Sequence, residues 1–267
     1  MNAIFRQACL TCTAFAIGCI APARADDFAA IASPPRFELA AKPGTVLREV
    51  LEIGNAASGA AKYALKTADW AFDASGGVVF TETLQPGSCR PWVAIERREI
   101  LVPVRNPYRF RFEVAPPADT PRGECRFALL ISGDEQVVKT PNASFPVSGQ
   151  LAVIVYVTIG DAQPLLEVVG SAVEKIDGEP TPVIRINNRG DAHGRLAGFL
   201  SGADASGKKF EFTPSTLPIL PGETRAISLI VNHEGDRPIP RLAYPITIRG
   251  KLEWGDQITP FEQRFAP

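Results

Sequence analysis

The sequence predicts an all-β protein made of two immunoglobulin-like β-sandwich domains in tandem. Three observations carry this prediction. The 267 residues include 24 prolines and 22 glycines, which divide the chain into short segments and disfavour a helical protein. Many segments alternate apolar and polar residues with the period of two that half-buried strands require. The second half of the chain also repeats the layout of the first, which indicates two similar units.

The N-terminus has the features of a secretory signal peptide over residues 1–25. A cationic start, a short apolar run and an Ala-x-Ala ending at Ala25 predict cleavage before Asp26. The alternative is a lipoprotein acylated at Cys19, which lacks the usual Leu three residues upstream. We therefore expect residues 26–160 and 161–267 to form the two domains of a periplasmic protein that has no membrane anchor.

Two cysteines remain after the predicted cleavage, Cys89 and Cys125. A pair of thiols in an exported chain most simply forms a disulfide, which contributes about 3 to 4 kcal/mol in the chain-entropy model. A metal site is the alternative, but it needs further ligands, and His193 and His233 lie far along the sequence.

About seven strands are expected before Gly160. The first, between Ile31 and Leu39, should be kinked or lie at an edge because Pro34 and Pro35 cannot donate ladder hydrogen bonds. Residues 46–53 and 62–70, separated by turn residues, look like a hairpin.

The clearest alternation runs from Tyr108 to Val114, where Tyr108, Phe110 and Phe112 share one face with Val114 and the charges take the other. A charged stretch from Gly133 to Pro146 follows and is expected to be a loop.

Residues Gln150 to Ile159 form the stretch around which the chain is organised. They carry no charge and are rich in β-branched residues, so we expect a strand that ends the first domain. Both faces are largely apolar, and the second must therefore lie under more protein or be offered to a partner. The sequence does not determine which face is open. The larger set, predicted to meet a partner, is Leu151, Val153, Val155 and Val157. The alternative is that the strand only completes its own domain's core.

The second domain contains segments that match the first. The turn after Val183 to Gly190 corresponds to the turn after Glu52 to Asn55, and Ile219 to Thr224 corresponds to Val102 to Pro107. Residues 244–254 and 258–265 are predicted to form a final hairpin around Gly255-Asp256. Because the connection near residues 160–164 is short, we expect a cleft between domains that are restrained in angle.

The chain resembles the periplasmic pilus-assembly chaperones of the PapD-like superfamily. The residues that carry the resemblance are Ser33 to Leu39, Leu151 to Ile159, Asn187 to His193 and Leu220 to Glu223, in that order along nearly all of the mature chain. The resemblance implies two sandwiches in an L shape, and a client that receives a strand from the end of the first domain. The implied partners are a pilus-type or other immunoglobulin-like subunit and, as a further candidate, an outer-membrane usher.

The resemblance also implies an Arg on the first strand and a Lys on the last strand of the first domain, which together bind the client's terminal carboxylate. Arg36 occupies a suitable position for the first role. The chain departs from the pattern at the second, because no Lys occurs between Lys139 and Lys175. Arg36 is therefore a candidate cleft anchor, and its alternative is a solvated strand residue.

Other chemistries find little support in the sequence. The chain has 28 basic and 29 acidic residues, so no general field attracts nucleic acid. His193 and Asp191 lack a marked nucleophile, and Arg189-Gly190-Asp191 has the composition of a tight hairpin turn. We expect no enzymatic activity, no metal and no cofactor. The leading hypothesis is a periplasmic chaperone that acts by strand donation. The alternative is a secreted structural or adhesive module that binds a surface protein or polymer.

Overall fold

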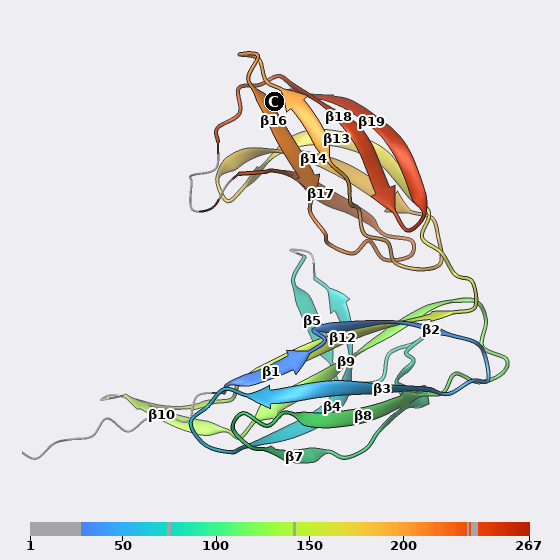
Figure 1. The fold of residues 1–267 in the computed structure, drawn as a ribbon, viewed down its shortest axis with the longest axis vertical. Coiled ribbons are helices and arrows are strands. Elements are labelled where there is room, and N and C mark those ends of the chain that lie inside the picture. Colours follow the sequence, from blue (N-terminus) through green and yellow to red (C-terminus); the bar gives the residue numbers. More distant parts are fainter. Residues whose placement is uncertain (1–27, 74–75, 141–142, 234, 236–239) are drawn as a thin grey trace, which may run out of the picture.

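Short alternating segments form strands throughout the chain. In this computed structural model the described residues are 28–73, 76–140, 143–233, 235 and 240–267. The predicted signal peptide over residues 1–25, with Cys19, lies outside them. Strands β1 to β12 build the first domain and β13 to β19 the second, and residues 160–165 connect them at one end (Figure 1).

Two main sheets enclose the core of the first domain. The four-stranded sheet has the order β1 (Ala30–Ser33), β3 (Leu47–Asn55), β8 (Tyr108–Val114) and β6 (Val93–Ile95). The six-stranded sheet has the order β2 (Arg36–Ala41), β12 (Gln150–Ile159), β9 (Gly123–Gly133), β4 (Ala61–Phe72) and β5 (Val78–Thr81), with β7 (Glu99–Val102) also on β4. A separate ribbon pairs β10 (Gln136–Thr140) with β11 (Ala143–Val147), and a short 3-10 helix covers Arg90–Trp92.

Aromatic side chains join the two sheets of the first domain. Phe112 on β8 contacts Phe37 on β2 edge to face at 5.1 Å and Phe127 on β9 at 6.3 Å between ring centroids. Such pairs add to the burial of large apolar surface. The predicted strand Tyr108 to Val114 is confirmed as β8, with Phe110, Phe112 and Val114 buried and the charged face outward.

The second domain is built from one seven-stranded sheet that folds over its own core. Its order is β13 (Leu166–Ile176), β14 (Glu179–Asn188), β17 (Thr224–Val231), β16 (Lys209–Pro214), β15 (Leu200–Ala203), β18 (Ile246–Trp254) and β19 (Gln257–Phe265). Phe212, Phe265 and Ile227 are among the fully buried side chains inside it. The predicted final hairpin is confirmed as β18 and β19. The chain is thus all-β, with two sandwich-like domains.

The first strand was predicted to be kinked or to lie at an edge, and the structure divides it at its prolines into β1 and β2, each at the edge of a different sheet. β1 pairs antiparallel with β3 in one sheet, and after Pro34 and Pro35 the chain enters the other sheet as β2, which pairs parallel with β12. Because proline donates no ladder hydrogen bond, this position is a natural point for the change of sheet.

Two sequence predictions about the first domain are wrong. Residues 46–53 and 62–70 do not form a hairpin, because β3 pairs with β1 and β8 while β4 pairs with β9, β7 and β5. Their connection crosses from one sheet to the other. The stretch from Gly133 to Pro146 is not a simple loop, because it contains β10 and most of β11. In both stretches the turn residues indicated where the chain changes direction, but they did not indicate which strands pair.

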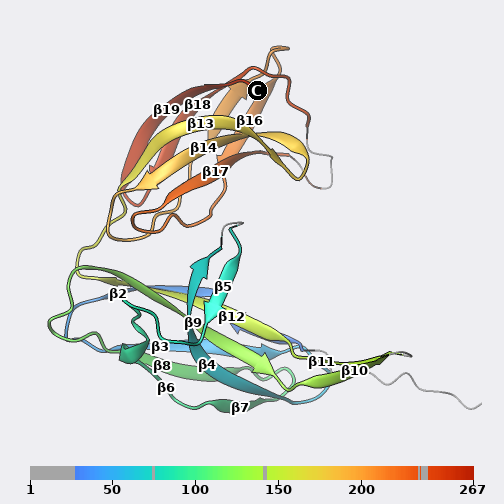
Figure 2. The same ribbon diagram turned by 180° about the vertical axis from the view of Figure 1, so that it is seen from behind.

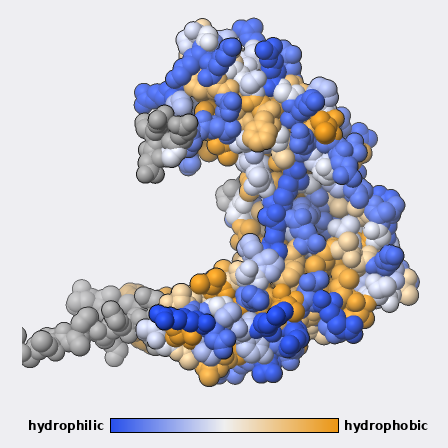
Figure 3. Space-filling model, viewed as in Figure 1, coloured by the Kyte–Doolittle hydropathy of each residue, from blue (hydrophilic) through white to orange (hydrophobic). Residues whose placement is uncertain are grey.

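The two domains enclose an open hollow, visible in the space-filling view (Figure 3). The β4–β5 hairpin leaves the first domain's sheet and rises toward the second domain (Figures 1 and 2). Its Phe72 lies under Arg225 of β17, with the guanidinium carbon 3.8 Å from the ring centroid. The hairpin therefore supports the second domain from the side of the hollow.

Candidate client-binding surface and interdomain cleft

Strand β12 has one fully paired edge and one partly paired edge. It pairs antiparallel with β9 from Gln150 to Ile159, and parallel with β2 only from Ile154 to Ile159. No strand in the described part of the chain pairs with residues 150–153 on the side away from β9. Backbone groups on this side are therefore open to a further strand.

The side chains predicted to meet a partner point instead into the first domain's core. Val153, Val155 and Val157 are buried, at 1%, 0% and 0% exposed. The prediction that these three valines contact a client directly is therefore wrong, because the sheet packs this face against β3 and β8. Leu151 is only half-buried at the rim of the same core.

The opposite face of β12 is covered by protein from several elements. Tyr156 packs with Trp70 of β4 edge to face at 5.7 Å, and Leu220 of the second domain closes the same cluster. Ile154 remains half-buried beside them. The second apolar face thus serves mainly the contact between the domains.

Three exposed apolar side chains lie on the β10–β11 ribbon, which extends from the end of the first domain far from the connection (Figure 2). Phe145 and Val147 on β11 are 53% and 51% exposed and share one face. Val137 on β10 is paired with Pro146 and lies on the other face. No strand among the described residues pairs with the outer edge of β11.

Gly149 separates this exposed pair from the buried part of β12. A side chain at Gly149 would collide with the ring of Phe28, which lies against the backbone there and contacts Tyr63 edge to face at 5.7 Å. Residues 145, 147, 149, 151 and 153 are alternate positions, which an extended chain directs to the same side. The chain thus passes from exposed apolar residues, through a covered glycine, into the core.

Arg36 lies on the face of β2 that is turned toward the second domain. Its register partner is Ile154, so it shares a face with Tyr156. The guanidinium is half exposed and pairs with Glu38, with 2.7 Å between Nε and the carboxylate oxygen. Glu38 also lies 3.7 Å from Nε of Arg195, a residue of the second domain. Arg36 therefore belongs to a group of charges that spans the cleft.

Tyr156 stands at the centre of that group. Arg195 donates to its hydroxyl across 3.4 Å, and the imidazole of His193 stacks on its ring at 3.8 Å. Burial raises the pKa of Tyr156 to about 12, although the nearby Arg195 opposes this shift. Arg195 also donates to the carbonyl of Thr216 at 2.6 Å, while its Nε makes no hydrogen bond within the described residues.

A buried carboxylate of the first domain holds His193. Glu124 on β9 accepts the backbone N–H of His193 at 3.0 Å, and its Oε2 lies 2.6 Å from Nδ1 of the ring. The side chain of Glu124 is 1% exposed and that of His193 9%. Glu124 lies 69 residues from His193 in the sequence, and sequence alone did not indicate it as the partner.

A second contact ties the connecting segment to both domains. Arg122 donates to the carboxylate of Asp191 at 2.5 Å, and Asp191 accepts the N–H of Gln163 at 2.8 Å. These bonds lower the pKa of Asp191, mainly through the guanidinium. The segment 189–192 is a bend, and not the tight hairpin turn that was predicted, since β14 pairs with β13 and β17.

The structure brings Cys89 and Cys125 together in the first domain's core. Both are buried free thiols here. A hydrogen bond to Cys125 and burial raise the pKa of Cys89. The pairing that the cysteine count indicated is geometrically supported, and the disulfide bond itself stays a prediction.

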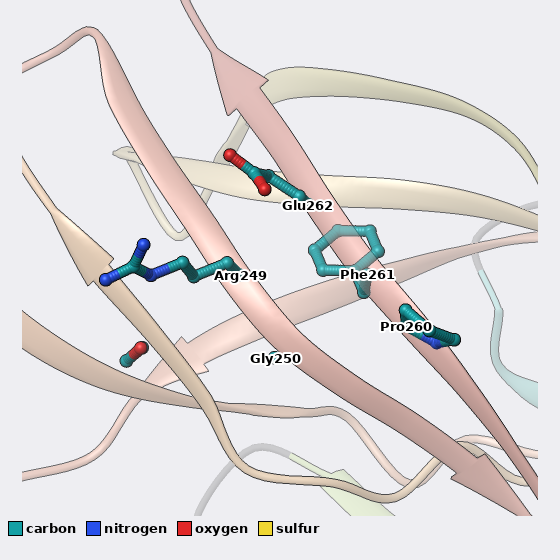
Figure 4. A pocket seen from close by; sticks show the side chains of 6 residues that line it. Arg249, Gly250, Pro260, Phe261 and Glu262 are labelled. Carbon is teal, nitrogen blue, oxygen red and sulfur yellow. The ribbon is translucent and has the colours of Figure 1, made fainter.

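Another hollow, of about 470 Å³, lies on the second domain across β18 and β19 (Figure 4). Arg249 and Gly250 on β18 face Glu262 and Phe261 on β19. No lining side chain of this hollow is a buried polar group without a partner among the described residues. It offers an open surface with two charges and no enclosed binding chemistry.

Further searches of the described residues concern membranes and metals. They contain no helix long and apolar enough to cross a bilayer. They also contain no group of three or more His, Cys, Asp or Glu side chains arranged to hold a metal ion.

The chain is similar to solved pilus chaperones. The class 5 fimbriae chaperone CfaA is 12% identical, with a TM-score of 0.46, over 89% of this chain and 99% of that one. The CupB2 chaperone of Pseudomonas aeruginosa is 12% identical, with a TM-score of 0.45, over 88% and 100% of the two chains. The matching chain in the complex of CsuC with the tip adhesion subunit CsuE, from Acinetobacter baumannii, is 13% identical, with a TM-score of 0.44, over 89% of this chain and 99% of that one. No family model and no curated protein matches the chain.

Proposed function

We propose that this chain is a non-enzymatic periplasmic chaperone that holds an exported β-rich subunit by lending it a strand. The observation that carries the proposal is the open edge that runs along β11 and continues to Val153. An incomplete immunoglobulin-like subunit has an exposed edge and an apolar groove, and an added strand satisfies both.

The client-binding side chains that we assign are Phe145, Val147 and Leu151, in place of the buried valines of β12. They share the same parity, so an extended segment directs all three to one side. Each large apolar side chain contributes about 1.5 to 3 kcal/mol when it passes from full exposure to full burial. Phe145 and Val147 are only half exposed, so each contributes less.

Arg36 fits the role of cleft anchor for a client carboxylate, and Arg195 is the cation that we assign in place of the absent Lys. Arg36 is half exposed on the cleft-facing side of β2. The Arg195 side chain is 21% exposed and contacts Glu38 through Nε at 3.7 Å, so it lies beside Arg36 through the carboxylate that both contact. Two guanidinium groups match the planar geometry of a carboxylate.

The proposal is tested by co-expression with small β-rich chains encoded by neighbouring genes. A client should precipitate when expressed alone and be recovered in complex with this chain. Phe145→Asp and Val147→Asp should each lower recovery about tenfold or more, because a charge would enter the client's groove. Val137→Asp is the matched control, since Val137 is 58% exposed on the other face of the ribbon.

Equal recovery with Phe145→Asp and Val137→Asp would contradict strand donation. It would favour a structural or adhesive module that binds through another surface. Circular dichroism of the isolated variants separates this outcome from misfolding, because all three positions are exposed and the fold should be unchanged.

A further inference from the structure

Cys89 and Cys125 meet where the six-stranded sheet is open on one side. Strand β4 pairs with β9 only as far as Ala128, and no strand among the described residues pairs with positions 124–127 of β9 on that side. Residues 85–89 lie there instead, and the thiol of Cys89 hydrogen-bonds to that of Cys125. The two thiol groups are therefore in contact.

Hydrogen bonds hold the segment that carries Cys89 against β4. Asp69 of β4 accepts from the hydroxyl of Ser88 at 2.6 Å and from the N–H of Gln85 at 3.0 Å. The guanidinium of Arg90 donates to the same carboxylate at 3.2 Å. Because Cys89 is 0% exposed, a reagent in solvent has no direct access to its sulfur.

Cys125 differs from Cys89 in its access to solvent. It is 8% exposed and lines a hollow of about 450 Å³, whose described wall does not include Cys89. Ile159 of β12, at the end of the first domain near the connection, lines the same hollow. Cys125 lies opposite Val157, which faces the core as Ile159 does, so the Cys125 side chain points to the side of the hollow. A volume of this size admits a small ligand.

The hydrogen bond between the thiols separates their roles. This bond and burial raise the pKa of Cys89, so its thiol stays protonated as long as Cys125 is a thiol too. The attacking group in disulfide exchange is a thiolate, so Cys89 is a poor group for the first step. Once the Cys125 sulfur is part of a disulfide, the main cause of the raised pKa is removed.

We propose that Cys125 is the site at which this chain exchanges with an external disulfide, and that Cys89 resolves the product. First, the Cys125 thiolate attacks one sulfur of the external disulfide, which leaves a mixed disulfide on Cys125 and releases the other half as a thiolate. The Cys89 thiolate then attacks the Cys125 sulfur and displaces the remaining half. Two electrons pass from the cysteines to the external disulfide, which becomes two thiols and takes up both protons.

The product would join the turn before the 3-10 helix to a strand that contacts the second domain. Glu124, the neighbour of Cys125, hydrogen-bonds His193, and Arg122 binds Asp191 just before the same strand. The cysteine pair lies away from the β11 edge, so its chemistry does not depend on strand donation.

The first test labels the reduced mature chain, which contains only these two cysteines, with a limiting amount of N-ethylmaleimide. Alkylation is irreversible, so the peptide that carries the label identifies the thiol that reacts first. We expect the label on Cys125 at least about tenfold more often than on Cys89, because reactivity follows access and thiolate character. Equal labelling, or a preference for Cys89, would overturn the proposal.

The second test uses two matched variants and glutathione disulfide as the probe. Cys89→Ser keeps the exchange site but cannot resolve the product, so it should accumulate one glutathionyl group, detected by mass spectrometry. Cys125→Ser should react at least about tenfold more slowly. In denaturing urea both thiols are exposed, and the two variants should react at rates within about twofold of each other. Circular dichroism verifies that each variant is folded without urea. Equal rates for the folded variants would contradict the assigned order.

Discussion

Two buried asparagines occupy corresponding positions in the two domains. Asn55 ends β3, and its amide nitrogen donates to the carbonyls of Gly59 and Val102. Asn188 ends β14, and its nitrogen donates to the carbonyls of Ala192 and Ile219. In both, the side-chain oxygen accepts the N–H two residues on, at 2.9 Å. The amides fix the point where each chain leaves its sheet.

Asn188→Ala should destabilise the second domain by about 3 kcal/mol. The residue is fully buried, and the substitution leaves several backbone groups without partners. Urea denaturation followed by Trp254 fluorescence measures the effect. Asn187→Ala is the matched control, because the neighbouring amide makes only exposed or half-exposed bonds and its loss should cost about 0.5 kcal/mol or less. Similar losses for the two variants would contradict this account.

The sequence indicated that the turns after residues 52–55 and 183–190 correspond. It did not indicate that the side-chain amides of Asn55 and Asn188 fix both turns. The alignment of residues 52–55 with residues 183–190 was inferred from apolar segments before a turn. The hydrogen-bond partners Val102 and Ile219 lie 47 and 31 residues away from their asparagines. Such partners follow from sheet topology, which local patterns do not specify.

The two edges of the ten-residue strand β12 differ in how far they are paired, and its two faces differ in what covers them. Its C-terminal part is paired on both sides, and its N-terminal part continues into a segment with an open edge. The uncharged run of residues 150–159 predicted the strand correctly. It did not reveal which side chains are covered, because a strand that is apolar on both faces has no polar side to mark solvent.

Val155→Asp should unfold the first domain and not merely weaken client binding. Val155 is 0% exposed in the core, so the substitution buries an unpaired carboxylate and costs about 4 kcal/mol or more. Phe145→Asp is the matched control, since that side chain is 53% exposed and its replacement should change stability by about 0.5 kcal/mol or less. The midpoint of urea denaturation distinguishes them. A folded Val155→Asp chain that has lost only its client would restore the first interpretation.

At the scale of the whole molecule, a few side chains set how the domains meet. Glu124 hydrogen-bonds His193, and Tyr156 of β12 stacks on the ring of the same histidine. Arg122 binds Asp191 beside the connection. The sequence predicted a short connection and a cleft. It did not single out Glu124 or Arg195, because each acquires its role only through contact with the other domain.

The contact between Arg122 and Asp191 should depend on pH. The guanidinium lowers the pKa of Asp191 below the ordinary value of an aspartate carboxyl group. The contact is therefore fully present above that value and is lost as the pH falls through the lowered pKa. In Arg122→Ala the pKa should return toward its ordinary value. The ¹³C signal of the Asp191 carboxyl group, followed by NMR as a function of pH, measures both.

Arg48→Ala provides the control for this titration. Arg48 forms a comparable exposed ion pair with Glu113 inside the first domain, away from the connection. The pKa of Asp191 should be the same in this variant as in the parent chain. An unchanged pKa in Arg122→Ala would mean that the backbone N–H of Gln163, and not the guanidinium, controls the carboxylate.

The parallel alignment of β2 with β12 has a mechanical consequence. Six consecutive positions, from Arg36 opposite Ile154 to Ala41 opposite Ile159, join the start of the first domain to its end. If the two ends of this domain were pulled apart along the strands, these positions would bear the load together in shear, since none could open ahead of the others. Tension transmitted through the polypeptide would meet its main resistance at this pair of strands.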